Sequence, residues 1–142
     1  MSMIKIGEGS GRKVYDLGNG YVLKEPYSET GLQQNETELH VYNNAIQFRE
    51  YLCPTFKGND HCNTMIKVDL ITLEEFNLIK TNPKIIEVLS YLYENFGLND
   101  DINHYKSWGK LNGKYVLLDY GYTNELFNEI MFKYTGDIQY LT

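Results

Sequence analysis

Three glycines and a lysine near the amino terminus are the first residues whose types and spacing could do chemistry. Gly7, Gly9 and Gly11 alternate with other residues, and Val14 follows them. A turn without side chains lets backbone amides approach phosphate oxygens closely. Lys24 ends a later apolar run, and its ammonium group could pair with the same phosphates. A plain glycine-rich turn and an exposed strand lysine are the alternatives.

A glutamate could complete such a site by pairing with the lysine. Glu38 stands at the start of the apolar stripe of a predicted helix, from which its side chain could reach Lys24. Glu36 is the fallback partner, although it lies further from the inner face. Asn35 and Glu38 also have the spacing of a capping box, which would explain the glutamate by local structure alone.

Asp119 is a second candidate carboxylate, at the end of a predicted hairpin. Residues 105–111 and 114–118 flank Asn112-Gly113, a strong signal for a tight turn between strands. A carboxylate at a strand end that faces phosphates is the hard oxygen ligand that Mg²⁺ prefers. An acidic residue in an ordinary turn is the alternative.

Apolar spacing and turn signals predict the elements that must position these residues. Strands are predicted over 3–17 and 21–24, and a helix over 39–52 that ends near Cys53-Pro54. The remaining predictions are strands at 55–56 and 64–70, a helix from a capping box at 72–75, a helix from Asn82-Pro83 to Gly97, and a last helix over 126–134. An antiparallel sheet followed by helices predicts an α+β fold.

Composition and charge limit the classes of protein to which this chain can belong. A chain of 142 residues with 42% apolar residues predicts one domain, 1–142. The net charge of −6 is spread along the chain, which argues against nucleic acid as a partner. No segment resembles a signal peptide or a membrane span, so we expect no membrane partner and a reducing cytoplasm. Cys53 and Cys62, with nearby histidines, lack zinc-site spacing, so buried thiols are expected.

Residues 6–15 resemble the glycine-rich loop of the protein-kinase family, G-x-G-x-x-G-x-V. The match is at Gly7, Gly9 and Val14, whereas the third glycine comes one residue early, at Gly11, and Arg12 stands in its place. The resemblance implies that these residues, with Lys24 and Glu38, bind ATP.

The segment Asp119-Tyr120-Gly121 is similar to the D-F-G motif of the same family. The resemblance implies that Asp119 holds Mg²⁺. It also implies a kinase-like α+β architecture, with residues 1–70 forming an amino-terminal lobe of antiparallel sheet and one helix. A hinge would follow, and residues 71–142 would form a truncated helical lobe that carries the hairpin.

The catalytic loop departs from the family pattern, because no H-R-D triplet is present in residues 99–107. If Ser107 takes the place of the metal-binding asparagine, the position of the base falls on Ile102. A gap of one residue moves Asp101 into that position as the catalytic residue and leaves Asn103 as a metal ligand. Only residues 122–142 follow the D-F-G-like motif, too few for the helices that support a peptide substrate.

Two functions are therefore expected from the sequence. The first is a pseudokinase-like binding or regulatory protein that acts on a protein partner, with weak or absent nucleotide binding. Its abundant Tyr, Asn, Lys and Ile suggest an AT-rich bacterial or phage source, and a phage protein would act in the host cytoplasm. The second is a minimal phosphotransferase that uses ATP and Mg²⁺ on a small or accessible substrate.

Overall fold

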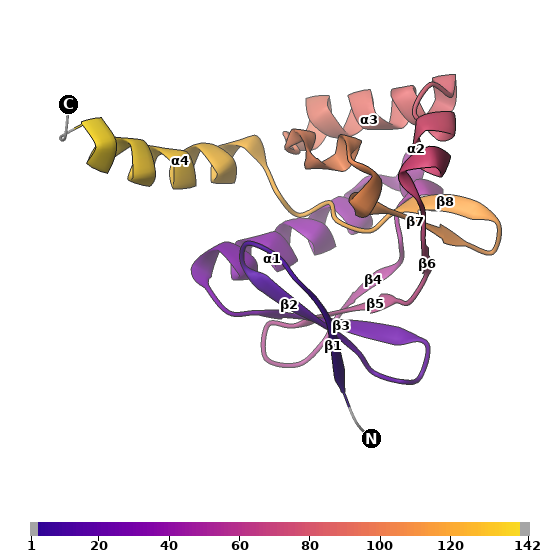
Figure 1. The fold of residues 1–142 in the computed structure, drawn as a ribbon, viewed down its shortest axis with the longest axis horizontal. Coiled ribbons are helices and arrows are strands. Elements are labelled where there is room, and N and C mark those ends of the chain that lie inside the picture. The colour runs from indigo at the N-terminus through magenta and orange to yellow at the C-terminus, as the bar shows by residue number, and fades with distance from the viewer. Residues whose placement is uncertain (1–2, 140–142) are drawn as a thin grey trace.

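Turn-forming glycines divide the amino-terminal segment into three antiparallel strands in the computed structural model, which describes residues 3–139. These strands are β1 (Ile4–Glu8), β2 (Arg12–Asp16) and β3 (Tyr21–Pro26). Gly18 and Gly20, between β2 and β3, have φ angles of 78° and 89°, which glycine adopts without steric cost. Strands β4 (Thr55–Lys57) and β5 (Asn63–Ile66) complete an antiparallel sheet in the order β1-β2-β3-β5-β4 (Figure 1).

Helix α1 (Glu29–Asn44) begins well before the predicted start at residue 39. The Ser28 hydroxyl caps it by accepting a hydrogen bond from the amide of Gly31. Apolar spacing missed the first turns because their buried side chains include polar ones, Asn35 and Glu38. The predicted helix also ends earlier than expected, since the chain continues after Ala45 as a 3-10 helix (Ile46–Tyr51).

A second antiparallel sheet has the order β6-β7-β8. It consists of β6 (Asp69–Leu70), β7 (Trp108–Leu111) and β8 (Lys114–Leu117). The strand predicted over 64–70 is therefore two strands in two sheets, and residues 105–107 form a 3-10 turn rather than part of a strand. The hairpin turn is as predicted, because Asn112 and Gly113 both have positive φ angles, 51° and 81°.

Local capping signals correctly predict where two helices begin and where one ends. Helix α2 (Leu73–Ile79) follows Thr72, whose hydroxyl accepts from the amide of Glu75 at 3.1 Å. Helix α3 (Pro83–Phe96) follows Asn82, whose side chain accepts from the amide of Lys84 at 2.8 Å. It ends at Gly97, which has the left-handed conformation expected there.

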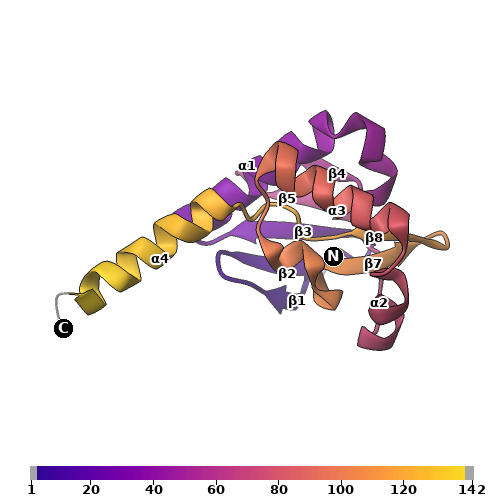
Figure 2. The same cartoon turned by 90° about the horizontal axis from the view of Figure 1, so that it is seen from above.

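One apolar cluster joins the two sheets and the helices. It contains Val22 and Met65 from the first sheet, Trp108 and Leu117 from the second, and Leu92 from α3. Helix α4 (Asn124–Gln139) projects away from both sheets in both views (Figures 1 and 2). Within residues 3–139, no helix combines the length and the apolar character needed to cross a membrane.

Candidate functional site

A cleft of about 760 Å³ runs between the glycine-rich segment and residues 101–108. The connection between β6 and α2 closes one side of it, and residues near Asp119 close another. Among the predicted site residues, those that line the cleft are Gly7, Gly9, Val14, Asp101 and Asp119. Ile6 and Val14 contribute apolar surface, as do Leu70 at the end of β6 and Ile71 just after it. The cleft therefore combines an apolar part with charged groups.

Lys24 and Glu38 form a buried ion pair beside this cleft. The Lys24 ammonium lies 2.9 Å from Glu38 Oε1, and the two side chains are 4% and 0% exposed. Because α1 begins at Glu29, Glu38 lies deep within the helix and cannot cap its start. The capping-box alternative is thus wrong. Asn35 instead donates hydrogen bonds to the carbonyls of Lys24 and His61, at 3.1 and 2.8 Å.

Lys24 uses all of its hydrogen-bonding capacity inside the protein. Besides Glu38, its ammonium donates to the carbonyl of Leu118 at 2.6 Å and to Asp119 Oδ1 at 3.5 Å. An ammonium group has three protons. No donor is left for a ligand in this arrangement.

Arg12 was not among the predicted site residues, and the sequence analysis noted it only as standing where the kinase pattern has a glycine. Its guanidinium donates to Glu38 Oε1 at 3.0 Å, to Asp119 Oδ1 at 3.0 Å, and to Asn35 Oδ1 at 3.0 Å. The sequence held a signal that Arg12 points toward the site. Side chains two residues apart on a strand share a face, and Val14, two residues after Arg12 on the same strand, lines the cleft. Arg12 and Lys24 thus bind the same two carboxylates from two neighbouring strands.

Asp119 is the exposed member of this cluster, with 54% of its side chain accessible. Burial of its surroundings opposes ionisation, but the positive charges of Lys24 and Arg12 and the hydrogen bond from Lys24 outweigh it and lower the pKa of Asp119. For Arg12, desolvation is likewise outweighed by Glu38 and Asp119, so its pKa is raised. We name these four residues, Arg12, Lys24, Glu38 and Asp119, the charge cluster. Two cations and two anions balance within it.

Two close backbone contacts hold the charge cluster in place. A Cβ on Gly31 would lie only 1.8 Å from the carbonyl oxygen of Gly11, so the glycine-rich segment rests directly on the first turn of α1. A Cβ on Gly121 would lie 2.2 Å from the carbonyl oxygen of Gln34, which fixes the segment after Asp119 to the same helix. Gly11 packs against α1 and does not line the cleft.

The segment that the sequence analysis compared with a catalytic loop includes a short 3-10 helix (Asp100–Asn103). Asp101 is exposed and lines the cleft, and its carbonyl accepts a hydrogen bond from the Ser107 hydroxyl at 2.8 Å. Ile102, at the position of the base in the ungapped alignment, is buried. Asn103 is exposed and is not among the residues that line the cleft.

Among residues 3–131, no group of three or more His, Cys, Asp or Glu side chains gathers in a way that could hold a metal ion. Asp119 Oδ1 accepts from two cations, Lys24 and Arg12. Cys53 and Cys62 are buried free thiols, and burial raises the pKa of Cys53 to about 12, so it is unreactive.

Comparison of the sequence with models of known protein families and with curated proteins gives no match in either case.

Proposed function

We propose that this chain is a kinase-like binding or regulatory protein that acts on a protein partner and takes ATP weakly or not at all. The order of its elements supports the kinase-like part: a glycine-rich strand pair, a helix that carries a paired glutamate, and a hairpin before Asp119. The ion pair between Lys24 and Glu38 next to Asp119 supports it further. Fold analogy alone does not establish function. The argument for or against nucleotide binding therefore depends on the contacts of Lys24, Arg12 and Asp119.

The single observation that carries the proposal is the closed hydrogen bonding of the charge cluster. A triphosphate needs free donors from Lys24, and a magnesium ion needs free oxygens on Asp119. Both needs compete with Arg12 and with the contacts already made inside the protein. Breaking a buried, hydrogen-bonded ion pair costs several kcal/mol, on the order of 3–5 when one partner is removed. A nucleotide would have to break these internal contacts before it could bind, and the free energy of breaking them would weaken its net affinity.

A thermal melt with excess ATP and Mg²⁺ tests this proposal. A ligand at 100 times its dissociation constant adds about 2.7 kcal/mol and shifts the melting temperature by a few degrees. We expect no shift for the wild-type protein at millimolar ATP. A shift of about 4 °C or more that disappears in Asp119→Ala would place a nucleotide in the cleft and contradict weak binding.

The alternative function is a minimal phosphotransferase that uses Lys24, Glu38, Asp101 and Asp119. One observation favours it: Asp101 and the exposed half of Asp119 line the same cleft. ATP turnover by the purified protein, compared with Asp119→Ala, tests this alternative. Turnover that the substitution abolishes would support it, and turnover that persists unchanged would belong to a contaminant or another site.

A further inference from the structure

Helix α4 is fixed at its base and extends from there into the space beyond the two sheets. The Thr123 hydroxyl caps it by accepting a hydrogen bond from the amide of Leu126 at 3.0 Å. The amide of Asn124 donates to the carbonyl of Gly97 at 2.8 Å, which bonds the start of α4 to the end of α3. From this anchor the helix runs away from both sheets in both views (Figures 1 and 2).

The projecting part of α4 presents large apolar side chains to solvent. Leu126, in the first turn, is only 5% exposed, whereas Phe127 and Met131 are 40% and 42% exposed. Most helical stability in proteins comes from packing an apolar face, and isolated helices shorter than about 12–15 residues are marginal in water. Helix α4 has 16 residues, so it is close to that limit. A surface that packs on its exposed face would stabilise it.

The spacing of the apolar residues indicates which kind of surface fits. Residues four, three and four positions apart form one series along α4: Phe127, Met131, Tyr134 and Ile138. We name these four residues the α4 stripe. Successive residues of a helix are about 100° apart, so the series makes one narrow stripe, and Glu129 falls on the opposite side. This alternation of four and three is the pattern of a helix that packs lengthwise against another helix.

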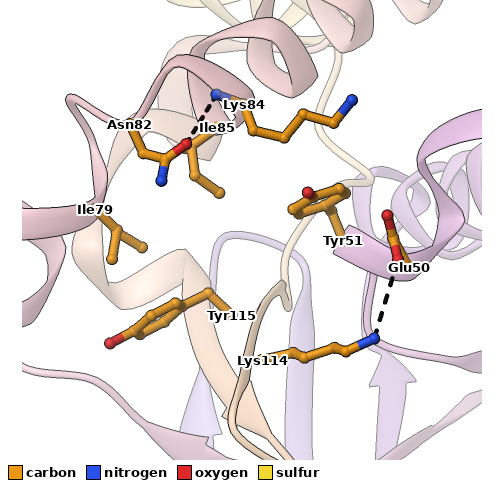
Figure 3. A pocket seen from close by; sticks show the side chains of 8 residues that line it. All are labelled: Glu50, Tyr51, Ile79, Asn82, Lys84, Ile85, Lys114 and Tyr115. Atoms are coloured by element: carbon orange, nitrogen blue, oxygen red, sulfur yellow. Dashed lines mark hydrogen bonds and ion pairs between the residues drawn. The ribbon is translucent and has the colours of Figure 1, made fainter.

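Neither hollow of the chain is lined by a described residue of α4. A smaller hollow of about 310 Å³ lies at the start of α3, where Ile79 and Ile85 are on the other side of the space from Tyr51 and Tyr115 (Figure 3). It is at the opposite end of α3 from the anchor of α4, and α4 points away from it (Figures 1 and 2). The hollows therefore do not cover the α4 stripe.

We propose that the α4 stripe packs against the α4 stripe of a second copy of this chain, with the two helices side by side about a twofold axis. A twofold interface needs a surface that is complementary to itself. The stripe meets this need, because two helices that pack lengthwise must share the same spacing. Its residues are also uncharged, so two copies can meet there although the net charge of −6 opposes contact elsewhere.

The length of α4 sets the strength of this association. A helix of 16 residues is about 24 Å long, so the paired surface is small. Interfaces that bury less than about 1,200 Å² belong mostly to weak or transient complexes. We therefore expect a reversible dimer whose population depends on protein concentration. No described residue of α4 lines the large cleft, so this pairing does not depend on nucleotide binding.

Sedimentation equilibrium of the full chain over a series of micromolar concentrations tests the proposal. The average mass should rise with concentration from 16.6 kDa toward twice that value. Met131→Lys and Ile138→Lys each place a charge in the paired surface and should weaken the dimer by about tenfold or more. Glu129→Gln is the matched control, because it changes the net charge by the same one unit on the opposite side of α4 and should leave the dimer unchanged.

A second measurement does not depend on how well the variants fold. Far-ultraviolet circular dichroism of the wild-type protein should show helix content that rises with concentration, since pairing stabilises α4. The proposal is overturned if the wild-type protein stays monomeric over the whole series, or if its mass passes that of a dimer. It is also overturned if Met131→Lys and Ile138→Lys associate as wild type does, or if Glu129→Gln weakens the dimer as much as they do.

Discussion

At the scale of single residues, Arg12 determines what the cleft can do. It stands where the kinase pattern places a glycine, and it reaches both Glu38 and Asp119 at 3.0 Å. A glycine at this place would leave the carboxylate of Asp119 open on one side. An arginine supplies a permanent positive charge at the carboxylate of Asp119, where a magnesium ion would otherwise act. Under the proposed function, this one residue is what closes the cleft to nucleotide.

The pairing of Asp119 makes stability depend on pH. Its pKa in the folded protein is lowered, so its contribution is present above the ordinary value of 3.8 and is lost as the pH falls through the lowered value. We expect Asp119→Asn to be less stable than wild type at pH 7, by no more than about 1 kcal/mol because the side chain is half exposed and solvent screens the pair.

Urea unfolding at pH 7 and at about pH 3 measures this effect, and the difference between the two proteins should be smaller at the lower pH. Asp101→Asn, in the same cleft, is the control and should change stability little at either pH. An equal difference between wild type and Asp119→Asn at both pH values would contradict the account.

At the scale of elements, helix α1 is the part that brings the site together. It supplies Glu38 to the charge cluster, and its backbone touches the glycine-rich segment at Gly31 and the segment after Asp119 at Gln34. These contacts are possible only because Gly11, Gly31 and Gly121 have no side chains. Gly11, which the sequence predicted as part of a nucleotide-binding loop, packs against this helix.

Gly31→Ala should destabilise the protein even though alanine favours helices. The added Cβ would lie 1.8 Å from the carbonyl oxygen of Gly11, and forced contacts of this kind cost about 1–3 kcal/mol. That cost exceeds the gain in helix propensity of about 1 kcal/mol. Gly9→Ala is the matched control, since a Cβ at that position would have nothing within 4 Å. Urea unfolding that shows Gly31→Ala to be as stable as wild type would rule out the close contact.

Elements with local signals could be predicted from the sequence, and elements set by long-range contacts could not. The caps at Thr72, Asn82 and Gly97 act within a few residues, so the starts of α2 and α3 and the end of α3 were predicted correctly. The start of α1 was missed because its buried face pairs with Arg12 and Lys24, which come from other strands. The contacts of Arg12 with Glu38 and Asp119 could not be predicted for the same reason, because these residues are far apart in the sequence.

At the scale of the whole molecule, the charge cluster joins segments that are far apart in the chain. It connects β2 and β3 with α1 and with the residue two positions beyond the end of β8. Glu38 is at the centre of this connection and is completely buried. Its loss would leave Arg12 and Lys24 side by side with only the half-exposed Asp119 to balance them.

Glu38→Gln should therefore destabilise the entire fold by about 3 kcal/mol or more, as expected when one member of a buried ion pair is removed. Glu36→Gln is the matched control, because Glu36 is exposed on the same helix and should change stability by less than about 0.5 kcal/mol. Chemical unfolding of both variants measures the difference. Equal effects would contradict the central role of the Glu38 carboxylate in the charge cluster.

The measurement that tests the central claim most directly is a calorimetric titration of Arg12→Gly with ATP and Mg²⁺, beside wild type and Lys13→Gly. Lys13 is the next residue of the same strand, so its substitution reproduces the loss of strand propensity without opening the charge cluster. The account predicts that wild type and Lys13→Gly show no saturable binding at millimolar ATP. We expect saturable binding by Arg12→Gly, because Asp119 Oδ1 then keeps Lys24 as its one cationic partner among the described residues. Equal binding of ATP by wild type and Arg12→Gly would contradict it.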